Sequence, residues 1–330
     1  MKDFSGKIAV ITGGGTGMGR ELARQLVAEG CNVAMCDVSE AAMAETKRLC
    51  EVERLPQGLR VTTHVADVAI EDLLKRFRDE LAAQHKTDRI HLLFNNAGIG
   101  GGGSLFASTR EQWERTFNIC WGGVYLGVRT FLPMLVAADE AHIINTASIN
   151  GFWASIGMMQ AHTAYSSAKF AVKGFTEGLI EDLRVNAPQV RVAVVMPGHV
   201  GTDIVTNSLR ARGLPAPEQM SDAEVEELIP ASARAGLIGA GALPADASAD
   251  DLRQLLIQAN ADFRDKAPLS AAAAATIILN RVRSGAWRIL VGQDAEWLDA
   301  AVRDKPEAAY DWAELARRAK ETPPAGTAGQ

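Results

Sequence analysis

Short apolar runs alternate with helical patterns over the first 195 residues of the chain. The runs are continuously apolar rather than alternating, as in strands covered by helices on both faces. They are Ile8–Ile11, Val33–Cys36, Val61–Val65, His91–Phe94, His142–Asn145 and Val190–Val195. The helical patterns between them are Arg20–Glu29, Glu40–Leu49, Glu71–Gln84, Glu111–Leu132 and Ala164–Val185. This order predicts an α/β fold, a doubly wound Rossmann-type parallel sheet of about seven strands flanked by helices.

The alternation stops after Val195. Residues 203–268 contain five prolines and four glycines, which predicts short helices joined by turns rather than one long helix. The α/β alternation then resumes with a predicted helix at Leu269–Arg283 and a predicted strand at Trp287–Val291. Two further helices are predicted at Asp294–Arg303 and Glu307–Lys320. The 330 residues would allow two domains by length alone. We expect one domain over residues 1–320, with a helical lid inserted at 203–268, a C-terminal helical extension at 292–320 and a disordered tail at 321–330.

Composition excludes several classes of partner. A net charge of −6 gives no reason to expect nucleic acid or an anionic membrane. The N-terminal apolar run is too short for a signal segment or a membrane span, so we expect a soluble, cytoplasmic protein. Four cysteines without a CxxC pair and six histidines without HxxH or HExxH spacing predict buried thiols and no metal site.

A glycine-rich turn follows the first predicted strand. Its sequence, TGGGTGMG over residues 12–19, places glycines at Gly13, Gly17 and Gly19. Glycines allow a tight turn and a close ligand, and the N-terminus of the next helix attracts a pyrophosphate. The spacing departs from the strict GxGxxG fingerprint, so a plain turn is the alternative. Its position between a strand and a helix favours nucleotide binding.

Asp37 ends the second predicted strand, 18 residues after Gly19. A carboxylate at this position can accept hydrogen bonds from both ribose hydroxyls of an adenosine and repels a 2′-phosphate. No arginine or lysine follows it before Lys47. We therefore predict NAD rather than NADP as the cofactor. The alternative is an aspartate that starts the next helix.

Further motifs occur in the same order as the predicted strands. They are Asn95-Asn96-Ala97-Gly98, Ser148, Tyr165-Ser166-Ser167-Ala168-Lys169 and Pro197-Gly198. Together with the glycine turn they resemble the short-chain dehydrogenase/reductase family over about residues 5–202, and more loosely over 269–292. The chain looks most like members that oxidise secondary alcohols or reduce ketones.

The resemblance implies a set of cofactor contacts. Asp67 and Val68 would contact the adenine. Asn95, Ala97 and Gly98 would contact the adenosine ribose and support the sheet. Thr202 would hold the nicotinamide carboxamide. The full expected set is Gly13, Gly17, Met18, Gly19, Asp37, Asp67, Val68, Asn95, Ala97, Gly98, Tyr165, Lys169, Pro197, Gly198 and Thr202.

The resemblance also implies a catalytic set of Asn118, Ser148, Tyr165 and Lys169. Tyr165 and Lys169 are spaced i, i+4 and share one helix face. A lysine ammonium and an oxidised nicotinamide both favour a tyrosine phenolate, which could then act as the base. Ser148 could stabilise a developing alkoxide, and Asn118 would hold a water that links Lys169 to solvent. Each residue has an ordinary structural alternative, such as a core tyrosine or a solvated lysine.

Two features bear on the substrate. Ser148 and Tyr165 are 17 positions apart, more than the family commonly shows, so the segment between them is expected to form a pocket wall through Phe152, Trp153, Met158 and Met159. Ordinary core packing is the alternative. The 203–268 segment has 6 basic and 11 acidic residues and many apolar ones. Its charge disfavours polyanionic substrates, and its apolar residues must pack on the domain, a second subunit or a ligand.

We therefore predict an NAD-dependent oxidoreductase that interconverts a secondary alcohol and a ketone, expected to be bulky and apolar. The alternatives are a 3-oxoacyl-thioester reductase of the same fold and a non-catalytic NAD-sensing regulator. The resemblance further implies a homodimer or homotetramer.

Overall fold

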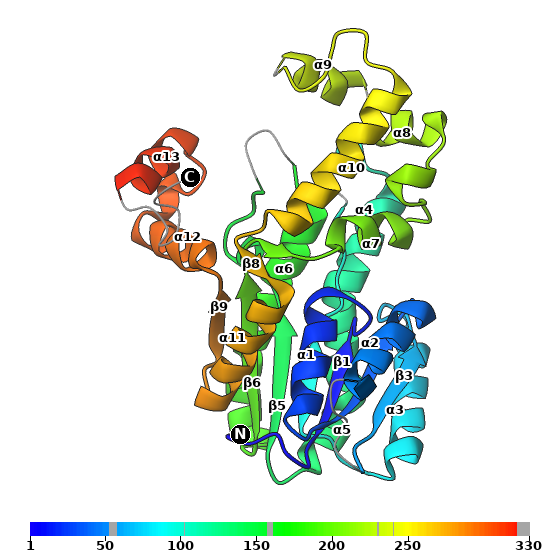
Figure 1. Cartoon of the computed structure of the whole chain (residues 1–330). Helices are drawn as coiled ribbons and strands as arrows, with labels where there is room; N and C mark the ends of the chain where they lie inside the picture. Colours follow the sequence, from blue (N-terminus) through cyan, green and yellow to red (C-terminus); the bar gives the residue numbers. More distant parts are fainter. Residues whose placement is uncertain (53–57, 102, 157–160, 230, 240, 322–330) are drawn as a thin grey trace.

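Parallel strands form a seven-stranded sheet in the computed structural model, which describes residues 1–52, 58–101, 103–156, 161–229, 231–239 and 241–321 (Figure 1). The strands are β1 (Ile8–Thr12), β2 (Asn32–Asp37), β3 (Val61–Val65), β4 (Leu92–Asn95), β5 (Ala141–Thr146), β6 (Val190–Pro197) and β9 (Arg288–Val291). Their order is β3-β2-β1-β4-β5-β6-β9. The order reverses between β1 and β4, so a crevice is expected at the carboxyl ends of these strands.

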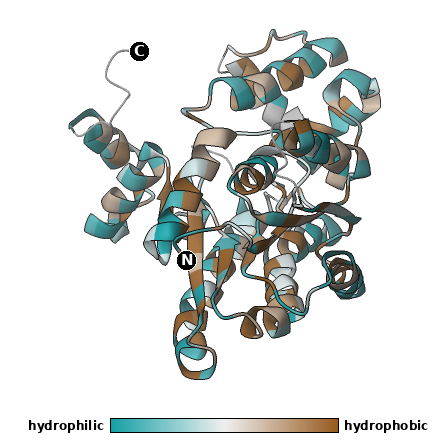
Figure 2. Ribbon diagram, turned by 60° about the horizontal axis from the view of Figure 1, so that its bottom comes forward, coloured by the Kyte–Doolittle hydropathy of each residue, from teal (hydrophilic) through white to brown (hydrophobic). Residues whose placement is uncertain are grey.

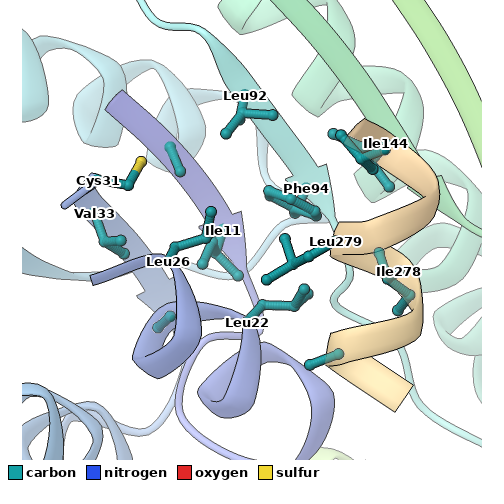
Figure 3. Packing of buried hydrophobic residues seen from close by; sticks show 14 of the residues in the cluster. Ile11, Leu22, Leu26, Cys31, Val33, Leu92, Phe94, Ile144, Ile278 and Leu279 are labelled. Atoms are coloured by element: carbon teal, nitrogen blue, oxygen red, sulfur yellow. The ribbon is translucent and has the colours of Figure 1, made fainter. Parts of the chain in front are cut away.

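Helices cover both faces of the sheet. One face carries α1 (Gly17–Ala28), α2 (Glu40–Val52) and α11 (Ala271–Ser284), and the other carries α3 (Glu71–His85), α5 (Gly123–Val136) and α6 (Thr163–Asn186). Figure 3 shows Leu22 of α1 and Leu279 of α11 gathered over Ile11 and Phe94 of the sheet. The predicted α/β fold class is confirmed.

Several expected boundaries were wrong. Val61–Val65 is not a fully covered strand, because β3 is at the edge of the sheet and Val65 is exposed. The stretch 111–132 is not one regular helix: α4 (Arg110–Phe117) meets α5 through a π-helical turn at Asn118–Gly122. The last helix, α13, begins at Trp312 rather than near 307 and includes Glu321. Residues 322–330, expected to be disordered, lie outside the described residues.

The stretch Arg110–Val136 is long and apolar enough to cross a membrane by length and composition. Of its most apolar 18 residues, 56% are buried inside the protein. Val128, Phe131 and Leu135 pack with α3 and the sheet in one apolar cluster. The stretch is therefore a helical part of the protein core.

The 203–268 segment forms a helical insertion with its own apolar core. It contains α7 (Ile204–Ala211), α8 (Asp222–Leu228), α9 (Ala231–Gly239) and α10 (Ala249–Asp265). A short parallel pair, β7 (Val200–Gly201) with β8 (Leu269–Ser270), joins its two ends. The buried residues of this core are Leu209, Met220, Val225, Ile229, Leu243 and Leu252. The apolar residues counted in the sequence thus pack largely on one another rather than requiring a ligand or a second subunit.

Several acidic residues of the insertion form ion pairs within it. Arg253 pairs with Asp222 and Asp250, and Lys266 pairs with Asp262. Figure 2 shows the mixed polar and apolar colouring of the outer helices against the apolar central strands. Such exposed charges are paired locally and screened by solvent. Pairing and screening thus weaken the charge of the insertion, and the repulsion of polyanionic substrates stays a prediction.

Because the insertion has its own core, we expect it to unfold locally while the sheet stays folded. Replacing Leu252, which is fully buried in α10, by alanine should cost roughly 2–5 kcal/mol within the insertion. We expect faster hydrogen exchange in α10 and proteolytic cleavage within 203–268, while the sheet keeps its protection. Gln254→Ala, an exposed position on the same helix, should change neither. Equal loss of protection in the insertion and the sheet would contradict a separate core.

Candidate active site

The turn between β1 and α1 needs glycine at specific positions. Gly13 and Gly17 have φ values of 67° and 53°, in the left-handed region that favours glycine. A Cβ on Gly19 would lie 2.0 Å from the carbonyl oxygen of Gly13, so a side chain there would collide with backbone. The turn therefore brings bare backbone to the N-terminus of α1, as phosphate binding requires.

A cavity of about 530 Å³ opens beside this turn, at the carboxyl edge of the sheet. Its described lining combines the turn with the ends of β2 to β4 and with α7. The lining residues are Gly13, Thr16, Gly17, Met18, Asp37, Val38, Ser39, Ala42, Ala66, Asp67, Val68, Asn96, Ala97, Gly98, Ile99, Arg115, Ile119, Thr202, Ile204, Asn207, Arg210 and Ala211. Most of the residues expected to contact a cofactor are thus brought together around one cavity.

Two backbone amides hold the carboxylate of Asp37 in place. Its Oδ2 accepts a hydrogen bond from Gly15 N at 3.0 Å, and its Oδ1 accepts one from Ser39 N at 3.1 Å. The carbonyl of Gly15 in turn accepts hydrogen bonds from Arg20 and Thr46. This arrangement fixes the carboxylate at the end of β2 on the cavity wall.

Asp67 and Val68 line the same cavity beyond Asp37. Arg115 of α4 donates from Nη2 to Asp67 Oδ2 at 3.2 Å and from Nε to the carbonyl of Ala211 at 2.9 Å. It therefore ties the cavity wall to the end of α7. Sequence reasoning missed Arg115, because no motif marks it.

The two adjacent asparagines after β4 have different roles. Asn95 is buried, and its Nδ2 donates to Asn145 Oδ1 at 2.8 Å, so it joins β4 to β5 instead of lining the cavity. Asn96 lines the cavity and donates to the carbonyls of Thr12 and Gly13. The expected direct contact of Asn95 with a ribose therefore finds no support, and Asn96 occupies the position facing the cavity.

Ser148, Tyr165 and Lys169 lie together close to the cavity. The Lys169 ammonium is 5.4 Å from the centre of the Tyr165 ring, and the Ser148 side chain is near enough to the Tyr165 hydroxyl to affect the pKa of that tyrosine. A Cβ on the cavity residue Gly98 would be 3.5 Å from Lys169 Nζ. Gly98 therefore connects the cavity to this group. Lys169 Nζ also donates to the carbonyl of Thr146 at 2.8 Å, which fixes its direction.

Burial controls the charges of this group. It raises the pKa of Tyr165 well above the ordinary value, although the nearby Ser148 side chain opposes the rise. It lowers the pKa of Lys169. Both shifts disfavour the charged forms, as desolvation does. A phenolate at Tyr165 thus needs a further positive charge nearby.

Asn118 lies in an irregular turn of helix, and its predicted role in holding a water stays a prediction. Asn118 begins the π-helical turn, where the resemblance implies a kinked helix, and its carbonyl accepts from Gly123 N. Its side chain is exposed. Cys120 lies nearer Lys169: both approach Gly98, and Cys120 Sγ donates to the carbonyl of Ile99 at 3.1 Å. The π-helical turn thus directs a buried thiol, which sequence reasoning missed, toward the tyrosine and lysine.

The turn after β6 contributes Thr202 to the cavity but not the two residues of its Pro-Gly motif. Pro197 ends β6, and neither it nor Gly198 is among the described lining residues of the cavity. Gly198 donates its N–H to the carbonyl of Val291 at 2.9 Å. Thr202 does line the cavity, and its Cγ2 would be 3.1 Å from a Cβ on Gly17. Thr202 is therefore next to the glycine turn.

Helix α7 crosses the cavity. Asn207 Nδ2 donates to Thr16 Oγ1 at 2.9 Å, and Gly100 N donates to Ser208 Oγ at 2.7 Å. Arg210 adds a second cation to Arg115 among the described lining residues. Asn207, Ser208 and Arg210 belong to the insertion, and nothing in the sequence fixes which of its helices covers the turn.

Comparison with known proteins identifies the family that shares these features. Residues 7–213, more than half of the chain, match the short chain dehydrogenase family. The chain belongs to this family. SadH of Mycobacterium tuberculosis, a protein named as an oxidoreductase, is 36% identical to this short-chain dehydrogenase over 213 residues, which are 64% of the chain and 74% of SadH. Levodione reductase of Leifsonia aquatica is 31% identical over 208 residues, 63% of the chain and 74% of its own.

Solved structures agree with this assignment. A short chain dehydrogenase/reductase from Burkholderia phymatum in complex with NAD is 29% identical, with a TM-score of 0.71 over 93% of this chain and 95% of its own. A metagenomic short-chain oxidoreductase in complex with NADP is 30% identical, with a TM-score of 0.52 over 59% of this chain and 83% of its own. The chain is therefore an oxidoreductase of the short-chain dehydrogenase type that uses a nicotinamide cofactor, and the glycine turn fits such a dinucleotide.

The backbone contact at Gly19 gives a direct test of the cavity. Gly19→Ala places a Cβ against the Gly13 carbonyl, so we expect at least a tenfold weaker binding of the reduced cofactor, equivalent to about 1.4 kcal/mol. Cofactor fluorescence measures the dissociation constant. Gly236→Ala, where a Cβ meets no atom within 4 Å, is the matched control. Unchanged binding by Gly19→Ala would place the dinucleotide elsewhere.

Proposed function

We propose that this short-chain dehydrogenase is an NAD-dependent enzyme that interconverts a secondary alcohol and a ketone. The observation that carries the proposal is the group of Tyr165, Ser148 and Lys169 close to the cavity, with the lining residue Gly98 next to Lys169. The relative named levodione reductase supports a carbonyl reduction. The presence of both Tyr165 and Lys169 favours an enzyme over a regulator that only senses the cofactor.

Tyr165 would take the proton in the alcohol-to-ketone direction. A secondary alcohol loses a proton from oxygen and a hydride from carbon, and a bound nicotinamide supplies the hydride acceptor. Ser148, whose side chain lies near the Tyr165 hydroxyl, would donate to the substrate oxygen as negative charge develops there. The tyrosine returns its proton to the ketone oxygen in the reverse direction.

Lys169 would favour the ionised tyrosine by its charge. Its ammonium is held over the Tyr165 ring through the hydrogen bond to Thr146. Because burial raises the pKa of Tyr165, the positive charge of an oxidised nicotinamide would be needed to lower it. The base would thus become effective when the cofactor is present, before the alcohol reacts.

The packing of the insertion bears on the predicted substrate. Its apolar residues form their own core, and several of its acids, among them Asp222, Asp250 and Asp262, are paired with basic residues. The expected preference for a bulky, apolar alcohol therefore has no support from the insertion. The predicted repulsion of polyanionic substrates stays untested. We propose the secondary alcohol or ketone group as the reacting centre and assign no size to the rest of the substrate.

Tyr165→Phe tests the acid–base assignment. Removal of the hydroxyl should lower kcat by roughly 10²–10⁴-fold, the usual contribution of a general base, while the NAD dissociation constant stays within about twofold of wild type. Turnover is measured by the absorbance of the reduced cofactor with a panel of secondary alcohols. Tyr125→Phe, an exposed tyrosine on α5, is the control. Full turnover by Tyr165→Phe would disprove the assigned base.

Asp37 tests the choice of cofactor. Asp37→Asn keeps an oxygen that can accept from Gly15 N or Ser39 N but removes the charge that would repel a 2′-phosphate. We expect the ratio of kcat/KM for NAD over NADP to fall about tenfold or more, since 1.4 kcal/mol corresponds to tenfold. Asp67→Asn should leave the ratio near the wild-type value. An unchanged ratio of kcat/KM for NAD over NADP in Asp37→Asn would disprove the role of Asp37 in selecting NAD.

A further inference from the structure

The segment after Ser148 is held by the C-terminal extension, here residues 292–321. Trp153 Nε1 donates to the carbonyl of Ala309 at 2.6 Å, and Ala154 N donates to the Tyr310 hydroxyl at 3.0 Å. The rings of Trp153 and Trp312 meet edge to face at 5.5 Å. Trp153 is 8% exposed and belongs to an apolar cluster with α12 (Gln293–Asp304) and α13 (Trp312–Glu321).

This packing corrects the expected role of the segment. Trp153 was expected on a pocket wall, but it points into the extension, and Phe152 packs partly in the same cluster. Met158 and Met159, expected on that wall, lie outside the described residues. The 17-position spacing between Ser148 and Tyr165 thus accommodates a contact between the loop and the extension.

Asn150 connects Trp153 to Ser148. Ser148 Oγ accepts from Asn150 N at 3.1 Å, and Asn150 Nδ2 donates to the carbonyls of Trp153 at 3.0 Å and Ser155 at 2.6 Å. On the opposite side, a Cβ on Gly151 would be 2.9 Å from the carbonyl oxygen of Lys169. The loop is therefore confined between α6 and the extension, and a shift of Trp153 would be transmitted to the serine hydroxyl.

The extension also contacts the turn after β6. His199 N donates to Asp294 Oδ2 at 2.6 Å, and a Cβ on Gly198 would overlap the same carboxylate. Asp294 is in the first turn of α12. One C-terminal segment thus contacts both the loop that carries Ser148 and the turn that follows Pro197.

We infer that the C-terminal extension is a positioning element of the active site, which sets the Ser148 hydroxyl relative to Tyr165 through Trp153 and Asn150, an inference that rests on the proposed role of Ser148. Orientation of a reacting group is sensitive, since a misplacement of about 1 Å can cost 10²-fold in rate. A purely stabilising extension would instead affect the melting temperature and leave the rate of the folded enzyme unchanged.

Two conservative variants test the inference. Trp153→Phe removes the Nε1 donor and keeps a ring, and Tyr310→Phe removes only the hydroxyl that accepts from Ala154 N. Both are assayed at a temperature well below their melting points. We expect kcat for a secondary alcohol to fall at least fivefold in Trp153→Phe and by a smaller factor in Tyr310→Phe, with NAD affinity within twofold of wild type. Trp287→Phe, at a half-exposed tryptophan beside β9, should retain wild-type kcat.

A double-mutant cycle identifies the route. If Trp153 acts through Ser148, Trp153→Phe should lower kcat in the wild-type background but change it less than twofold in a Ser148→Ala background. An equal fold-change of kcat by Trp153→Phe in the two backgrounds would overturn the inference. Wild-type kcat in both Trp153→Phe and Tyr310→Phe, or a loss of NAD binding that accompanies the loss of kcat, would overturn it as well. Full activity of Ser148→Ala, or of Tyr165→Phe, would instead refute the proposed function itself.

Discussion

The parallel direction of the central strands is the constraint on which the site depends. Parallel strands bring their carboxyl ends to one edge, and the reversal of order between β1 and β4 leaves a crevice there. The glycine turn, Asp37 and Ser148 all follow strands that end at this edge. The hydrogen bonds between Asn95, Asn145 and Thr176 then fix β4, β5 and α6 against each other. The tyrosine and lysine of α6 thereby acquire a fixed place beside the cavity.

The sequence predicted what local patterns determine. Strand periods, the glycine turn and the i, i+4 pair of Tyr165 and Lys169 depend on neighbouring residues, so the fold class and nine of the 22 described lining residues of the cavity could be predicted. Asn95 and Asn96 mark the limit of this reasoning. Adjacent residues at a strand end point to opposite sides, and the motif does not say which side faces the cavity. The structure turns Asn95 toward β5 and Asn96 toward the turn.

Contacts between distant segments were not predictable from patterns. Trp153 and Ala309 are 156 positions apart, and Arg115 meets the carbonyl of Ala211 across 96 positions. Large apolar residues near the expected substrate path suggested a pocket wall, but hydrophobicity does not identify the partner that covers a side chain. The single-turn π-helix at Asn118–Gly122 likewise has a local geometry that periodicity does not reveal.

The pairing of β7 with β8 has a consequence for how the protein can vary. Val200 lies opposite Leu269, so the chain leaves for the insertion and returns at the same place. Segments whose ends are close tolerate changes in length at a small entropic cost. The part of the insertion beyond α7 can therefore change in length without altering the register of β6 and β9, whereas α7 itself is constrained because Asn207 contacts Thr16 of the glycine turn and lines the cavity.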